Sequence, residues 1–159
     1  MLKVVSNTTP LLSFIKLNRL DILQEIYQRI YIPEAVYKEI ETGKGKYYKD
    51  ISKENWIIIK KVKNKNLVEK YTEFIDIGEV EAIALSLEIK ANLLLIDDRK
   101  GRTITEKENI NITGTVGILI KAKKLGIIKE IKPYIYELIE KGNFYSETFI
   151  KLILKHSGE

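Results

Sequence analysis

The stretch that decides the fold is Leu93-Leu94-Leu95-Ile96-Asp97-Asp98. A continuous run of aliphatic side chains is typical of a strand that is buried on both faces, as the strands of parallel sheets are. Two adjacent carboxylates follow directly at the carboxyl end of this strand. In open parallel α/β sheets, functional sites form beyond that end. The stretch therefore predicts a parallel sheet, with Asp97 and Asp98 at the edge where sites form.

Short apolar runs alternate with helical periodicity on both sides of this strand. The other predicted strands are Leu2–Ser6, Arg29–Ile32, Trp56–Val62 and Asn111–Thr113. The start signal Thr8-Thr9-Pro10 predicts a helix through about Lys16. Further helices are predicted at Asp21–Tyr27, Pro33–Glu41, Asn66–Phe74, Glu79–Lys90, Gly101–Glu108, Thr115–Lys124, Glu130–Lys141 and Ser146–Lys155.

Strand and helix in repetition predict an α/β fold with a mostly parallel sheet and helices on both faces. The 159 residues contain no internal repeat, linker or low-complexity segment. We therefore expect a single domain over residues 1–159 that closes with a helical hairpin at about 130–155.

The composition excludes several classes of site. The chain has no cysteine and a single histidine, His156, so disulfides, thiol nucleophiles, thiolate zinc sites and multi-histidine sites are excluded. Neither common glycine-rich phosphate loop is present. A metal ion held by this chain must therefore bind oxygen ligands.

The net charge of +5 reflects 27 Lys and Arg residues against 22 Asp and Glu residues. Lysine is densest in Lys38–Lys70, where ten lysines face five acids. A basic chain is compatible with a polyanionic partner, and equally with a solvated lysine-rich surface. No apolar run approaches the ~20 residues of a membrane span, so we expect a cytoplasmic protein with no membrane segment.

Acidic side chains gather at the predicted sheet edge. Asp97 and Asp98 repel each other, and burial raises the cost of that repulsion. A hard divalent cation such as Mg²⁺ or Mn²⁺ would offset it, and carboxylates around such an ion suit phosphodiester hydrolysis by metal-activated water. Glu39, Glu79 and Glu81 are further candidate ligands at this edge.

Ordinary structural roles remain open for the same acids. Asp97 and Asp98 can cap the next helix, and Glu79 and Glu81 can complement a helix dipole. Glu39 can be an exposed helix residue. Glu79 and Glu81 also stand roughly 200° apart around a regular helix, so both face one metal only if one of them sits in the cap region.

Five segments, in order, carry a resemblance to a known family. They are Val4-Val5-Ser6-Asn7-Thr8-Thr9-Pro10-Leu11, Ile32-Pro33-Glu34-Ala35-Val36-Tyr37-Lys38-Glu39-Ile40, Gly78-Glu79-Val80-Glu81-Ala82-Ile83-Ala84-Leu85, Leu94-Leu95-Ile96-Asp97-Asp98-Arg99-Lys100-Gly101-Arg102 and Thr113-Gly114-Thr115-Val116-Gly117-Ile118-Leu119. With these segments the chain resembles PIN-domain proteins, specifically small prokaryotic proteins related to VapC toxins.

The resemblance implies a three-layer α/β/α domain with a central sheet of about five parallel strands. It also implies Mg²⁺- or Mn²⁺-dependent cleavage of RNA, often by a toxin that is paired with an antitoxin, and it implies a homodimer. The acids that match the family are Glu39, Glu79 with Glu81 as its competitor, Asp97 and Asp98. The family's small hydroxyl matches Thr8 or Thr9.

One residue departs from the family pattern. The acid that usually ends the first strand is Asn7 here, which keeps an oxygen ligand and loses the negative charge. The site should therefore attract a divalent cation less strongly. The expected fold is the same with Asn7 at this position. An alternative function follows, in which the domain binds RNA or a protein partner and is a weak or inactive catalyst.

The first hypothesis is thus a PIN-like, metal-dependent endoribonuclease. Asn7, Glu39, Glu79, Asp97 and Asp98 form its expected catalytic set. The residues expected near RNA are Thr9, Lys44, Lys46, Arg99 and Arg102. Ion pairing with the neighbouring acids is the structural alternative for the two arginines. A receiver-like domain is disfavoured, because the acid pair expected after its first strand is missing.

Overall fold

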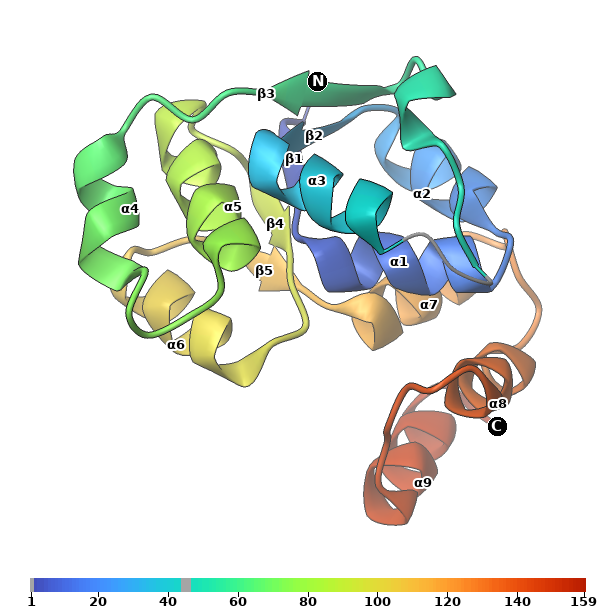
Figure 1. The fold of residues 1–159 in the computed structure, drawn as a ribbon. Helices are drawn as coiled ribbons and strands as arrows, with labels where there is room; N and C mark the ends of the chain where they lie inside the picture. Colours follow the sequence, from blue (N-terminus) through green and yellow to red (C-terminus); the bar gives the residue numbers. More distant parts are fainter. Residues whose placement is uncertain (1, 44–46) are drawn as a thin grey trace.

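A computed structural model describes residues 2–43 and 47–159. Its centre is a five-stranded sheet in the order β3-β2-β1-β4-β5 (Figure 1). The strands are β1 (Val4–Ser6), β2 (Ile30–Pro33), β3 (Ile57–Lys60), β4 (Leu93–Leu95) and β5 (Ile112–Thr113). Every neighbouring pair runs parallel, which confirms the expected α/β class.

The strand order reverses at the middle of the sheet. The chain moves outward from β1 to β2 and β3, then returns to place β4 on the other side of β1. The register aligns Val5 with Tyr31 of β2 and with Leu94 of β4. In open parallel sheets, the crevice at such a switch point is the usual ligand site. The carboxyl ends of β1 and β4 are therefore the first place to look for function.

Both faces of the sheet are buried, which explains the uninterrupted aliphatic strands. Val4 and Leu95 belong to one apolar core, whereas Val5, Leu94 and Ile96 belong to another on the opposite face. This alternation follows from the two-residue period of a strand. It produces the three-layer α/β/α arrangement expected from the sequence.

Helices cover the two faces unequally (Figure 1). The first core is completed by α1 (Thr8–Lys16), α2 (Leu20–Tyr27), α3 (Glu34–Thr42), α7 (Thr115–Lys124), α8 (Lys132–Glu140) and α9 (Glu147–His156). The second is completed by α4 (Lys65–Tyr71), α5 (Ile77–Glu88) and α6 (Arg99–Lys107). A single turn of 3-10 helix, η1 (Ile51–Lys53), precedes β3. Within the described ranges, no helix has the length and apolar character needed to cross a bilayer.

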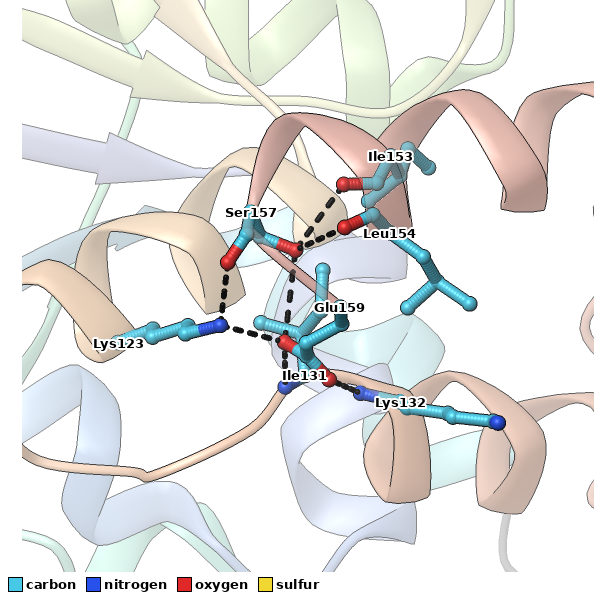
Figure 2. A network of polar contacts seen from close by, with 7 residues as sticks. All are labelled: Lys123, Ile131, Lys132, Ile153, Leu154, Ser157 and Glu159. Atoms are coloured by element: carbon cyan, nitrogen blue, oxygen red, sulfur yellow. Dashed lines mark hydrogen bonds and ion pairs between the residues drawn. The ribbon is translucent and has the colours of Figure 1, made fainter.

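The last two helices are fixed to α7 by the carboxylate of Glu159 (Figure 2). Its oxygens accept hydrogen bonds from the backbone N–H groups of Ile131 at 2.8 Å and Lys132 at 3.0 Å, at the start of α8. Lys123 of α7 donates to the same carboxylate at 2.9 Å. The N–H groups at the start of a helix have no partner within the helix and favour an anion. Glu159 therefore joins α7, α8 and the end of α9 in one network.

Candidate active site at the switch point

The expected site residues come from four elements around the switch point. Asn7 follows β1, and Asp97 and Asp98 follow β4. Glu79 lies in the first turn of α5, and Glu39 lies in α3.

Asn7 has a side-chain oxygen with nothing to bind in the described part of the chain. Its N–H donates to the carbonyl of Leu95 at 2.9 Å, which fixes it between β1 and β4. It occupies the N-cap of α1, where an Asn side chain ordinarily accepts a hydrogen bond from the first turn. No such cap bond forms here, and the buried Oδ1 has no partner among the described residues. A buried polar oxygen of this kind needs a ligand or a water.

Glu39 is held from α1 by a threonine hydroxyl. Thr8 Oγ1 donates to Glu39 Oε2 at 2.7 Å. Of the two threonines that matched the family's small hydroxyl, Thr8 therefore contacts a site acid, whereas Thr9 is exposed. Gly78 leaves room for Glu39, because a Cβ at that position would lie 2.2 Å from Oε1.

Glu79 is the most strongly perturbed acid of the site. Only 9% of its surface is exposed, and its Oε2 is buried without a partner in the described residues. Burial raises the pKa of Glu79 from 4.5 to about 7, with help from the charges of Asp98 and Asp76, a hydrogen bond with Asp98 and the charge of Glu39. Glu79 therefore lies within the electrostatic reach of three other carboxylates.

Asp97 and Asp98 have separate partners despite being adjacent. Asp97 accepts two hydrogen bonds from Thr115, from its N–H at 2.7 Å and from its hydroxyl at 2.6 Å. Asp98 caps α6 and accepts from the N–H groups of Lys100 at 2.8 Å and Gly101 at 3.1 Å. The helix-capping role that the sequence left open for both aspartates therefore belongs to Asp98. Its carboxylate also lies beside Glu79.

Glu81 is hydrogen-bonded to the start of α3. Its Oε1 accepts a hydrogen bond from the N–H of Ala35 at 3.1 Å, at the start of α3. The different environments of Glu79 and Glu81 follow from their spacing on one helix, where residues two positions apart face different neighbours. Glu79 is accordingly the member of the pair that lies beside Asp98.

The residues expected near RNA divide into three groups. Arg99 is exposed at the start of α6. Arg102 points inward, where its Nη2 donates to the carbonyl of Ile96 at 3.3 Å. This bond makes Arg102 a neighbour of the strand end and not a freely exposed cation. Lys44 and Lys46 lie outside the described residues.

Several neighbours of the site were not assigned a role from the sequence. Asp76, the N-cap of α5, raises the pKa of Glu79 through its charge. Thr115 orients Asp97. Tyr145, between α8 and α9, is near enough for Asp97 to help burial raise the pKa of the tyrosine. Of these three residues, only Asp76 could have been found from the sequence, because it stands three residues before Glu79. Thr115 and Tyr145 come from distant elements.

The donor set suits a hard divalent cation, although the described residues contain no group of three or more acids arranged as a ready-made metal site. The unpartnered oxygens of Asn7 and Glu79 are both buried, and carboxylate and amide oxygens are the ligands that Mg²⁺ and Mn²⁺ prefer. A cation would also relieve the repulsion around Glu79. The residues present therefore fit such an ion.

The structure thus places carboxylates at the switch point of a three-layer α/β/α fold. A sequence profile described as PIN domain matches residues 3–159, and the chain belongs to this family. PIN domains are generally nucleases, so membership of the family indicates that the protein is a hydrolase. Proteins of this family in general bind RNA. A comparison with curated proteins finds no significant match.

Proposed function

We propose that this protein is a Mg²⁺- or Mn²⁺-dependent endoribonuclease. The observation that carries the proposal is the cluster around Glu79, whose buried Oε2 has no partner in the described residues and whose pKa burial raises to about 7 beside Asp98, Asp76 and Glu39. Buried carboxylates with raised pKa values concentrate at functional sites. The family supports the same class of activity.

In this proposal, Glu39, Glu79, Asp97 and Asp98 hold the cation, and Asn7 contributes a neutral oxygen. Thr8 orients Glu39 through its 2.7 Å hydrogen bond, and Thr115 orients both oxygens of Asp97. Fixed side chains of this kind lower the cost of arranging the ligands. When bound, the cation would polarise the attacking water and neutralise charge that develops on the phosphate.

Asn7 supports a second candidate function. An amide at this position removes one negative charge from the ligand set, while its buried Oδ1 stays without a partner in the described chain. A domain with weakened cation affinity would bind RNA or a protein partner and cut slowly or not at all. This candidate and the enzyme share the same site and differ in the rate of hydrolysis.

The biological setting is also part of the proposal. A VapC-like toxin, inhibited by an antitoxin protein and acting as a homodimer in the cytoplasm, is the setting that the resemblance suggests. The cleavage of RNA by the isolated chain does not depend on this setting, so the two are tested separately.

Cleavage of a labelled single-stranded RNA with Mn²⁺ or Mg²⁺ tests the enzyme. We expect the wild type to cut, and Glu79→Gln to lose at least tenfold in rate, because its amide cannot supply a charged ligand. Glu106→Gln, an exposed change of the same chemistry on α6, is the matched control and should cut like the wild type.

A different pattern would favour the second candidate. If the pure wild type binds RNA without cutting it, and Asn7→Asp gains metal-dependent cleavage, the chain is a binding module whose missing charge is the cause. Equal cleavage by the wild type and Glu79→Gln would contradict the proposed site.

A further inference from the structure

Two hollows lie side by side beyond the carboxyl end of β3 and share Lys61 as a common wall. The first has a volume of about 580 Å³ and is lined by Lys38, Lys61 and Lys65 together with Glu39 of the candidate site. The second has a volume of about 450 Å³ and is lined by Lys60, Lys61 and Lys63. A line of lysines therefore leads away from the acidic site over the edge of the sheet.

Three acids, Glu34, Glu39 and Glu81, also line the first hollow, and Glu88 lines the second. Glu39, Glu81 and Glu88 accept hydrogen bonds from described residues. In the first hollow, Glu81 accepts from the N–H of Ala35 at 3.1 Å, and Glu39 accepts from Thr8 at 2.7 Å. In the second, Glu88 accepts from the N–H groups of Lys63, at 2.6 Å, and Asn64. Among the described residues, none of these three carboxylates forms an ion pair with a lysine.

The lysines, in contrast, keep their ammonium groups available. Lys38, Lys61 and Lys65 are exposed. Their ammonium groups form neither a hydrogen bond nor an ion pair with any of the described residues, whereas Lys49, Lys123 and Lys141 pair with acids elsewhere. The second hollow has three lysines against the single acid Glu88, whereas the three lysines of the first hollow equal its acids in number. The excess of lysine in the second hollow attracts an anionic ligand.

We propose that the two hollows form one phosphate track, along which the backbone of a single-stranded RNA runs to the acidic site. This inference rests on the proposed function and identifies the surface that receives its substrate. A nuclease site rich in carboxylates repels the phosphates of its own substrate, so the attraction must come from beside it. Positively charged grooves that follow the backbone are how proteins hold single strands without sequence preference.

A single strand fits this surface better than a duplex does. Hollows of this size admit a flexible backbone that can bend from one to the next. A duplex presents its phosphates on a wide and rigid cylinder, and proteins contact it mainly by its overall shape. Lys61 stands between the hollows, where it would contact successive phosphates.

Binding without catalysis tests the track directly. The full chain in EDTA is titrated into a fluorescent single-stranded 12-mer RNA over a series of salt concentrations, with anisotropy as the readout. We compare the wild type with the triple variant Lys38→Gln, Lys61→Gln, Lys65→Gln. The matched control is Lys124→Gln, Lys129→Gln, Lys151→Gln, which removes the same charge from exposed positions that line neither hollow.

We expect the track variant to bind at least tenfold more weakly than the wild type. The slope of log K against log salt should fall by about 2, since each lost phosphate contact to a single strand removes about 0.7. The control should stay within twofold of the wild type. Equal losses in both triple variants would show that only net charge matters, and would overturn the track. A duplex of the same sequence that binds as tightly as the single strand would overturn the single-strand assignment.

A second arm with Mn²⁺ separates the track from the enzyme. If the wild type fails to cut and the track variant still loses binding, the track stands and the proposed function fails. If the wild type cuts, and the track variant binds and cuts like the control, the track fails and the enzyme stands.

Discussion

Asn7 departs from the family pattern in sequence, and in the structure its side chain is unusual as well. Asn is among the most favoured N-cap residues, and Asn7 occupies the N-cap of α1. In the structure, however, the side chain does not cap the helix, and its buried Oδ1 is left without a partner in the described residues. The amide oxygen of Asn7 is therefore available to a ligand or a water molecule at the carboxyl end of β1.

Glu79 leads to a prediction about stability and pH. Its pKa rises from 4.5 in the unfolded chain to about 7 in the fold, so between these values the folded state binds more protons than the unfolded state. The contribution of Glu79 to stability is therefore complete below about pH 4.5 and is lost as the pH rises through 7. At 1.36 kcal/mol per pKa unit, this rise in pKa corresponds to a loss of roughly 3 kcal/mol.

Thermal unfolding in EDTA at pH 5 and pH 8 measures this effect. Gln resembles the protonated form of Glu, so Glu79→Gln should match the wild type at pH 5 and be more stable than the wild type at pH 8. Glu106→Gln should show no such change between the two pH values. A Glu79→Gln variant that differs from the wild type by the same amount at both pH values would contradict the raised pKa.

At the scale of elements, the site depends on the close approach of α3 and the start of α5. Gly78 makes this approach possible, because a Cβ there would lie 2.2 Å from Glu39 Oε1. Gly78→Ala should force the Glu39 carboxylate to move, since the end of a long side chain yields more easily than the backbone. Gly78→Ala should therefore weaken metal binding and activity at the site and leave the stability of the fold nearly unchanged.

We expect Gly78→Ala to bind Mn²⁺ and to cut RNA at least tenfold more weakly, with a melting temperature within a few degrees of the wild type. Alanine is intrinsically the better helix former by about 1 kcal/mol, which works against any loss of stability. Gly78→Ala combined with Glu39→Asp shortens the displaced side chain and should recover part of the activity. Full activity in the single variant would show that Glu39 has room to spare.

The elements were more predictable than the contacts between them. Leu93–Leu95 was recognisable because a strand at the centre of the sheet is covered on both faces and therefore reads as an unbroken aliphatic run. The helix starts differ from the expected ones by two residues at α6 and α5. The helix α6 begins at Arg99, where the Asp98 side chain caps it, and α5 begins at Ile77, where Asp76 forms no side-chain cap bond. Caps act locally, and several residue types satisfy them equally well.

The site was predictable in its acids and less so in their partners. The carboxylates were expected at the strand ends because parallel strands bring those ends together. Sequence left open whether Thr8 or Thr9 contacts the site, because both stand in the first turn of α1 and only the position of α3 decides between them. Thr115 orients Asp97 from 18 positions away, a contact that no local pattern specifies.

Across the whole molecule, the net charge of +5 is the sum of two separate groups of charges. Carboxylates occupy the switch point between β1 and β4. Lysines line the hollows that begin beside Glu39 and continue past β3. The lysines of the hollows would attract a polyanionic substrate, and the carboxylates at the switch point would act on it. A divalent cation would offset the repulsion between the substrate phosphate and these carboxylates.

The central claim is that the buried oxygens at the switch point bind a divalent cation. Isothermal titration of the purified, metal-free chain with Mn²⁺ at pH 8 measures this binding without RNA. At pH 8 the Glu79 carboxylate, whose pKa is about 7, is largely ionised, so proton competition is small.

We expect the wild type and Glu106→Gln to bind Mn²⁺ with the same affinity. We expect at least tenfold weaker binding by Glu79→Gln, and tighter binding by Asn7→Asp, which restores a negative ligand. If Glu79→Gln binds Mn²⁺ as tightly as the wild type, or if neither the wild type nor Asn7→Asp binds it, the switch point is not a cation site and the claim is wrong.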